Sequence, residues 1–324
     1  MTGAAKRRAP EVGAMDILNQ GFRVLRALPL HVLAAYYVGA LPFVLGFLFF
    51  WSDMSGSAFA GGRCLAASLA MAGLFWWMKC WQTVFARGVR EAVTGLPAER
   101  LTPRAVARLA TLQLMVQPYG LVLIPVAMLL TVPFYSVYTF FQNVTALGDG
   151  SERDPRVVMR RAWTQALLWP RQNHILLWLL CPWVLALGLL VAFGSMWLVF
   201  MFTPELQQMH GALWFVMSLL VLYNLILPLC PFSCVVAGNL AIVLAVLPWT
   251  LHTLFGAQTV FTLSGMHAIV NTTFLITVYG LSYLCLDPVV KTLYTVRCFL
   301  GEAQATGEDI LAELRSLRKE SADE

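Results

Sequence analysis

Long apolar runs separated by short polar and basic segments dominate this chain. Each run is close to or above the roughly 20 residues that a helix needs to cross about 30 Å of hydrocarbon. We expect spans at Leu30–Trp51, Cys64–Ala86, Leu112–Phe141, His174–Phe202, Leu213–Leu229, Ser233–Leu254 and Phe261–Leu286. The last three lie in a stretch, Leu206 to Leu286, without Asp, Glu, Lys or Arg. The pattern predicts an all-α fold, a polytopic transmembrane helical bundle.

The third run differs from the others because Pro118, Pro125 and Pro133 interrupt it. Proline removes a backbone donor and tends to kink or stop a helix. Basic loops precede and follow this run, and they cannot share one side of the membrane if the run crosses once. We therefore predict about six full spans plus one proline-broken or re-entrant element, residues 112–141, that returns the chain to its starting side.

Composition supports a membrane protein. Of the 324 residues, 59% are apolar and 12% are charged, whereas soluble domains carry about 25% charged residues. This excludes a soluble enzyme or binding module. The formal net charge of +5 is too small to indicate a nucleic-acid partner. The seven cysteines form no CxxC pair, and we expect them to be reduced.

The basic residues set the expected orientation. Lys and Arg cluster before the first predicted span, after the second, after the third and in the C-terminal segment. Since such residues favour the cytoplasmic side, we expect a multi-pass protein of the cell inner (cytoplasmic) membrane with both termini in the cytoplasm. The predicted domains are a cytoplasmic amphipathic segment (1–29), a membrane domain (30–286) with cytoplasmic loops 87–111 and 142–173, and a cytoplasmic helical tail (287–324).

Two segments have the pattern of interfacial amphipathic helices. Met15–Leu28 places Leu18, Phe22 and Leu25 opposite Arg23 and Arg26. Arg156–Trp169 is predicted to place Met159, Ala162, Trp163 and Ala166 opposite a basic face of Arg156, Arg160, Arg161 and Gln165. These arginines are candidates for contact with anionic lipid, although a connecting helix packed under the bundle has the same pattern.

The C-terminal tail contains a second kind of signal. Thr306 followed by Gly307, Glu308 and Asp309 is typical of a helix N-cap with acids in the first turn. The tail either docks a partner, such as an envelope membrane protein, or forms a plain solvated helix.

Polar groups at membrane depth are the candidate functional residues. They are Lys79, Asn224, Asn239, Asn271 and Asp287. Lys79 is expected to extend toward the membrane surface, and Asp287 before Pro288 to cap a helix. The asparagines either bond between helices or line a cavity.

No catalytic pattern is present. The chain has no HExxH, P-loop or GxGxxG motif, and its five histidines have no Cys or carboxylate at ligand spacing. The sequence therefore predicts a protein that is not an enzyme and that uses no cofactor.

Two sequence features resemble a known group. Leu123-Ile124-Pro125 followed by Arg156–Trp163 resembles the kinked helix and amphipathic helix of YciC-like proteins and of the membrane domains attached to some glycerophosphodiester phosphodiesterases. Asn271–Phe274, Leu284–Lys291 and Thr306–Asp309 resemble an uncharacterised bacterial subfamily. The resemblance implies a role in the cell envelope and carries over no catalytic residue, because the group's phosphodiesterase activity belongs to a separate soluble domain.

Two hypotheses follow. The first is a non-enzymatic scaffold or assembly component for cell-envelope proteins, in contact with the lipid bilayer and with partners through the C-terminal tail. The alternative is a transporter or lipid-handling protein with a site near the broken third span and the later spans that carry asparagine, because transporters often build sites from discontinuous helices.

Overall fold

A computed structural model describes residues 12–97, 101–129, 134–180, 232–258, 262, 271–307 and 310–312. Every element within these ranges is an α-helix, which confirms the all-α prediction. The helices are α1 (Ala14–Ala27), α2 (Leu30–Gly56), α3 (Ala60–Thr94), α4 (Pro103–Leu129), α5 (Phe134–Leu147), α6 (Pro155–Leu167), α7 (Pro170–Leu180), α11 (Phe232–Phe255) and α13 (Thr272–Thr306).

Five helices of the described residues are long and apolar enough to cross a membrane: α2, α3, α4, α11 and α13. Three of the predicted spans coincide with α2, α3 and α11. Most of His174–Phe202, all of Leu213–Leu229 and part of Phe261–Leu286 lie outside the described residues. The protein is therefore a membrane protein with several spans.

The last predicted span and the predicted tail are joined in one helix. α13 continues through Asp287 and Pro288 to Thr306, so the expected boundary at residue 287 falls inside a helix. Thr306 is the last residue of α13, and its hydroxyl donates to the Glu302 carbonyl at 3.2 Å. Gly307 follows with φ +71°, a conformation that commonly ends helices. The predicted N-cap at Thr306 is therefore wrong.

The third apolar run forms two antiparallel helices, α4 and α5. Gln117 of α4 donates to Phe141 O and Thr145 Oγ1 of α5 at 3.3 and 3.2 Å, and Leu112 packs against Leu147. The start of α4 therefore lies beside the end of α5, so the chain turns back between these helices; its return to the starting side of the membrane stays a prediction. Of the three prolines that were expected to interrupt the run, Pro118 and Pro125 lie inside α4 and do not end it; Pro133 is outside the described residues.

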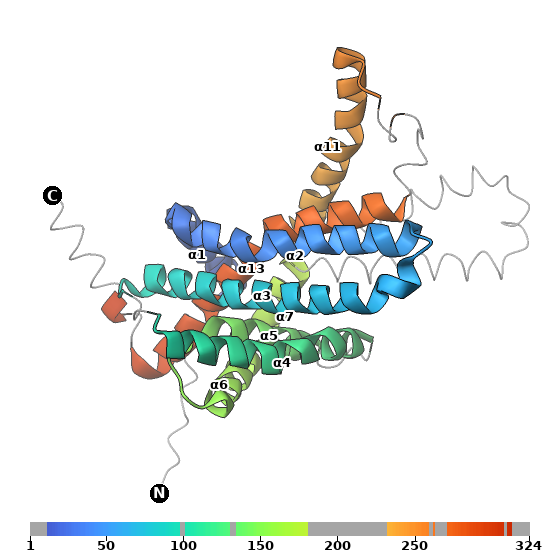
Figure 1. Ribbon diagram of the computed structural model, residues 1–324. Helices are drawn as coiled ribbons and strands as arrows, with labels where there is room; N and C mark the ends of the chain where they lie inside the picture. Colours follow the sequence, from blue (N-terminus) through green and yellow to red (C-terminus); the bar gives the residue numbers. More distant parts are fainter. Residues whose placement is uncertain are drawn as a thin grey trace, which may run out of the picture. The chain divides into compact units, whose positions relative to one another are not determined.

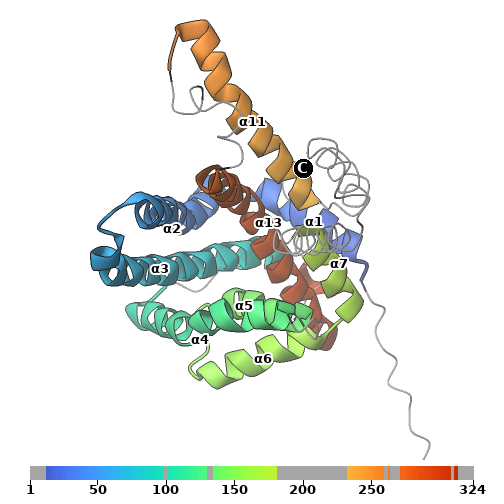
Figure 2. The same cartoon turned by 90° about the vertical axis from the view of Figure 1, so that its right-hand side faces the viewer.

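The chain divides into two compact units, Met1–Ile175 with Leu284–Glu324, and Leu176–Tyr283. In the first unit, α2 lies against α3, α3 against α4 and α5, and α5 against α6 (Figure 2). Small residues allow close approach between α2 and α3: a Cβ on Gly39 would overlap Trp81, and one on Gly88 would lie 2.6 Å from Val32. The second unit contains α11, whose apolar side chains are exposed along its length.

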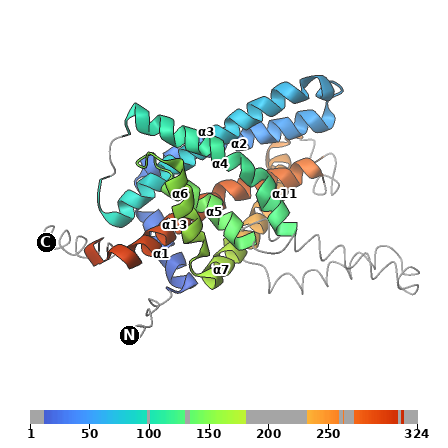
Figure 3. The same cartoon turned by 90° about the horizontal axis from the view of Figure 1, so that it is seen from below.

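One end of the first unit carries most of its described basic residues. The start of α2, the end of α3 and the start of α4 lie at this end (Figure 1, Figure 3). The basic residues near it are Arg23, Arg26, Arg87, Arg90, Arg104, Arg108, Arg153, Arg156, Arg160 and Arg161. At the opposite end, between α2 and α3, Arg63 pairs with Asp53 at 3.5 Å.

The two predicted amphipathic helices are present as α1 and α6. In α1, Ile17 and Gly21 are buried, whereas the expected Leu18, Phe22 and Leu25 are half-buried beside them. Gly21 backs directly onto Leu293 of α13. The centre of the buried face is thus one residue before the predicted one.

α6 begins with the N-cap Asp154, which accepts from the Arg156 N–H at 2.9 Å. Its buried residues are Val158, Ala162, Gln165 and Ala166. Gln165 was expected on the basic face, and Trp163, expected on the packed face, is 43% exposed. The correction has a physical cause, because α13 crosses α6 at Gln165, where Gly301 leaves room for its side chain.

Candidate functional site

Asp287 lies at the centre of a buried polar cluster in the first unit. Asp287 lies near the middle of α13, and its side chain is nearly inaccessible to solvent. The carboxylate accepts hydrogen bonds from Tyr36 Oη of α2 at 3.0 Å and from Gln82 Nε2 of α3 at 2.8 Å. Lys291 Nζ, one turn further along α13, lies 4.0 Å from the other oxygen. Asp287 therefore links three helices, and its predicted role as a helix cap is wrong.

Two lysines complete the cluster. Lys79 Nζ donates to Gln82 Oε1 at 3.2 Å, so Gln82 connects the Lys79 ammonium to the Asp287 carboxylate. Lys291 Nζ donates to Gln142 Oε1 of α5 at 2.6 Å. We call Tyr36, Lys79, Gln82, Gln142, Asp287 and Lys291 the Asp287 cluster; it joins α2, α3, α5 and α13, and it holds two ammonium groups for one carboxylate.

Pro288 provides a further contact between α13 and α2. A proline inside a helix has no N–H for the carbonyl four residues earlier, which here belongs to Leu284. Tyr37 Oη donates to that carbonyl at 3.5 Å. The neighbouring tyrosines of α2 therefore serve both the Asp287 side chain and the backbone group that Pro288 leaves free.

Arg297 is a second buried charge of α13, and it satisfies the end of α6. Its Nε donates to Gln172 Oε1 at 3.1 Å, its Nη1 to the Gln165 carbonyl at 3.0 Å, and its Nη2 to the Leu168 carbonyl. The last carbonyls of a helix lack partners within the helix and attract cations. Arg297 therefore caps α6 from a neighbouring helix.

Glu302 fixes the end of α13. Its two carboxylate oxygens pair with Arg90 of α3, at 3.1 Å, and with Arg161 of α6. Partial burial acts to lower the pKa of the Arg161 guanidinium, but the hydrogen bond with Glu302 and the negative charges of Glu302, Glu152 and Asp149 together outweigh it, so this pKa lies above its usual value. We call Arg90, Arg161 and Glu302 the Glu302 clamp.

Among the other predicted site residues that the structure describes, Asn239, Asn271, Arg156 and Arg160 do not join these groups. Asn239 donates to Val235 O at 2.8 Å in its own helix. Asn271 accepts from Thr273 N at 2.9 Å at the start of α13. Asn224 lies outside the described residues. Of the three arginines on the predicted basic face, Arg161 belongs to the Glu302 clamp, while Arg156 and Arg160 are exposed.

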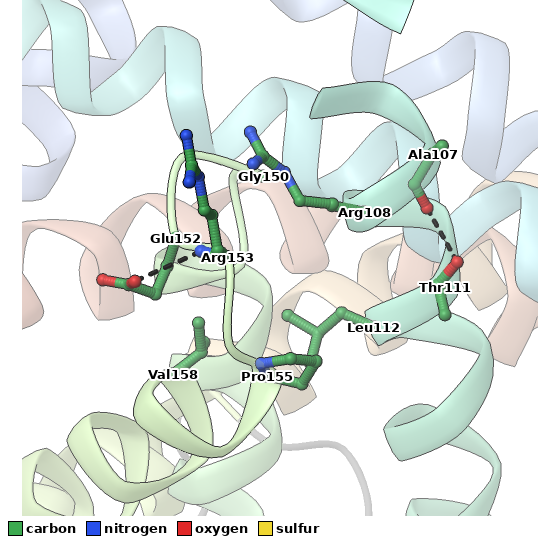
Figure 4. A pocket seen from close by; sticks show the side chains of 9 residues that line it. All are labelled: Ala107, Arg108, Thr111, Leu112, Gly150, Glu152, Arg153, Pro155 and Val158. Carbon is green, nitrogen blue, oxygen red and sulfur yellow. Dashed lines mark hydrogen bonds between the residues drawn. The ribbon is translucent and has the colours of Figure 1, made fainter. Parts of the chain in front are cut away.

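A pocket of about 300 Å³ lies at the basic end of the first unit. It is formed by the first turns of α4, the loop before α6 and the start of α6 (Figure 4). Its lining includes Arg108, Thr111, Leu112, Gly150, Glu152 and Arg153. Gly150 has φ +81°, and a Cβ there would overlap the backbone carbonyl of Ala105. The backbone of the loop therefore packs directly against α4.

Several members of these groups were missed as candidates in the sequence. Lys291 and Arg297 were assigned to the cytoplasmic tail, and Gln82, Gln142 and Glu302 were not singled out. A signal was available, because Leu284–Phe299 is apolar except for Asp287, Lys291, Arg297 and two threonines. Charges within such a helical pattern indicate buried partners on other helices.

Comparison with known proteins does not assign a family. No protein-family model matches this chain, and neither a curated protein nor a solved structure matches it. The resemblance to YciC-like proteins stays a prediction.

Proposed function

We propose that this chain is a scaffold or assembly component of the bacterial cytoplasmic membrane, which holds cell-envelope proteins together without catalysing a reaction. One observation carries the proposal: the second half of α13 is held at two places, by the Asp287 cluster and, near its end, by the Glu302 clamp. The chain that follows Thr306 thus leaves the bundle from a fixed point.

The distribution of charge supports an orientation with this end in the cytoplasm. Most of the basic residues in the described part of the first unit lie in α1, the end of α3, the start of α4, and α6 with the loop before it. Lys and Arg favour the cytoplasmic side. Both termini are then cytoplasmic, because α1 precedes α2 and α13 ends at the Glu302 clamp.

α6 supports attachment to the lipid surface at the same end. Arg156 and Arg160 are exposed, and so are Trp163 and Leu167, at 43% and 52%. Basic residues beside a tryptophan suit the region of lipid headgroups.

The test is recovery of partners from native membranes in mild detergent. A chain ending after Thr306 is the appropriate truncation, because it keeps Glu302 and both of its arginine partners. We expect specific membrane proteins to be recovered with the full chain and lost with the truncated chain, while the two proteins have the same Tm. A chain ending after Arg297 is the matched destabilised control. Recovery of no partner, or of the same partners by both chains, contradicts the proposal.

A second candidate function is transport, and one observation favours it. Two lysines share one carboxylate among membrane helices, and ionisable groups in this setting often belong to ion or proton pathways. The test is proton movement into liposomes that contain an internal pH dye, for the wild type and for Asp287→Asn. Transport predicts dye acidification that the variant abolishes. A wild-type rate equal to that of empty liposomes contradicts it.

A further inference from the structure

We infer that the pocket between the start of α4 and the loop before α6 binds a phosphate group, through the guanidinium groups of Arg108 and Arg153. Both arginines line the pocket. In Figure 4 both side chains extend toward the same side of the loop. This site is separate from the Asp287 cluster and goes beyond the proposed scaffold function.

Arg108 carries an unsatisfied donor. Its Nε is buried and has no hydrogen-bond partner among the described residues. A buried donor on a charged group is costly when it is unpaired. Arg108 lines the pocket, and a guanidinium group binds phosphate with two parallel hydrogen bonds, so an anion there would give this side chain an acceptor.

The acids of the neighbouring loop are already engaged by backbone groups. Asp149 accepts from the Ser151 N–H at 2.9 Å, Glu152 from the Arg153 N–H at 3.1 Å, and Asp154 caps α6. In Figure 4 the Glu152 carboxylate points away from the two guanidinium groups. The carboxylates of this loop are therefore engaged by its own backbone, whereas Arg153 lines the pocket.

The size and position of the pocket suit a headgroup. About 300 Å³ is at the lower end of the range for small-molecule sites. The pocket is at the basic end of the membrane helices, where phosphates of anionic lipids are concentrated. The same chemistry would accept a soluble phosphate, and the experiment separates these two sources.

The experiment measures Tm of purified, delipidated full-length protein in a neutral detergent. Phosphatidylglycerol, phosphatidylcholine and inorganic phosphate are added separately at equal ionic strength. A ligand that binds only the folded protein raises Tm with its concentration. We expect phosphatidylglycerol to raise Tm, and Arg108→Gln to require about tenfold more of it, because one charge-assisted contact is lost. Arg153→Gln provides an independent second variant if Arg108→Gln does not fold.

Arg104→Gln is the matched control, because Arg104 is an exposed arginine of α4 one turn away from Arg108. It is expected to respond to phosphatidylglycerol as the wild type does. A Tm increase with inorganic phosphate alone, lost in both pocket variants, supports the site and assigns it to a soluble phosphate. The inference is overturned if neither phosphatidylglycerol nor phosphate raises Tm, or if the pocket variants and Arg104→Gln respond alike. Loss of partner recovery on truncation is a separate readout and does not depend on this site.

Discussion

Replacing Asp287 by asparagine tests whether the Asp287 cluster holds the membrane helices together. The substitution keeps the size of the side chain and removes its charge. Tyr36 and Gln82 would still face a polar group, the side-chain amide of the asparagine. The Lys291 ammonium would lose its only charged partner among the described residues; it lies 4.0 Å from the carboxylate, and its side chain is 2% exposed. The Lys79 ammonium, joined through Gln82, would lose the same counter-charge.

The magnitude follows from burial. Removing one member of a buried ion pair costs about 3–5 kcal/mol, because the remaining charge is left uncompensated. With an unfolding entropy of about 2.1 cal/mol/K per residue, a chain of 324 residues converts this loss into a fall in Tm of roughly 4 to 7 °C. The assay is thermal unfolding in detergent, followed by intrinsic tryptophan fluorescence.

A double variant separates charge from packing. Replacing a whole buried ion pair by apolar residues of similar size is often neutral. Asp287→Leu with Lys291→Met should therefore lose less stability than the sum of the two single variants, by about 1–3 kcal/mol. Additive losses would show that the carboxylate and the ammonium do not interact.

Asp53→Asn is the matched control in the same chain. Asp53 pairs with Arg63 at 3.5 Å, but the Arg63 side chain is 56% exposed, and exposed pairs contribute about 0–1 kcal/mol. Its Tm should stay within about 1.5 °C of the wild type. The reasoning is refuted if Asp287→Asn is as stable as the wild type, or if Asp53→Asn loses as much.

Three further substitutions test other contacts of the first unit. Gly39→Ala should lower stability by about 1–3 kcal/mol, because its Cβ would overlap Trp81. The control is Gly73→Ala in α3, whose Cβ meets open space and should not lower Tm. The same Tm for both variants would contradict close packing of α2 and α3. Glu302→Gln should speed amide hydrogen exchange in the last two turns of α13, since both ion pairs of its clamp are weakened; unchanged exchange there would show that the clamp does not hold the helix end. Gly150→Ala should cost about 1–3 kcal/mol, because its φ of +81° and the Ala105 carbonyl both exclude a Cβ, and a wild-type Tm would show that the loop can leave α4.

Hydrophobic periodicity and length were sufficient to predict the spans that coincide with α2, α3 and α11. Each is a run whose length alone fixes it as a membrane helix. The antiparallel pair of α4 and α5 was also predicted, from the charge of the loops on either side of it. Two of the three prolines on which the prediction rested do not end a helix, because Pro118 and Pro125 are tolerated inside α4, as prolines often are in membrane helices.

The functional groups were harder to predict because they are made by folding. Lys79 and Asp287 are distant in sequence and become connected only through Gln82. Local sequence rules explained the two residues separately: Lys79 as a lysine that extends toward the membrane surface, and Asp287 as a helix cap. Only the packing of α3 against α13 shows that they belong to one cluster, and a single sequence does not contain that contact.

The pair Asp287-Pro288 explains why α2 packs against α13 in one particular register. In lipid, apolar packing alone discriminates weakly between helix positions, and polar contacts between helices add about 1 kcal/mol each. Tyr36 donates to the Asp287 carboxylate, and Tyr37 donates to the Leu284 carbonyl that Pro288 leaves without a donor. Sliding α2 by one turn, about 5.4 Å, would leave a buried carboxylate and a free carbonyl unsatisfied together. The same pair that interrupts the hydrogen bonding of α13 therefore fixes its register against α2, which the proposed scaffold function requires.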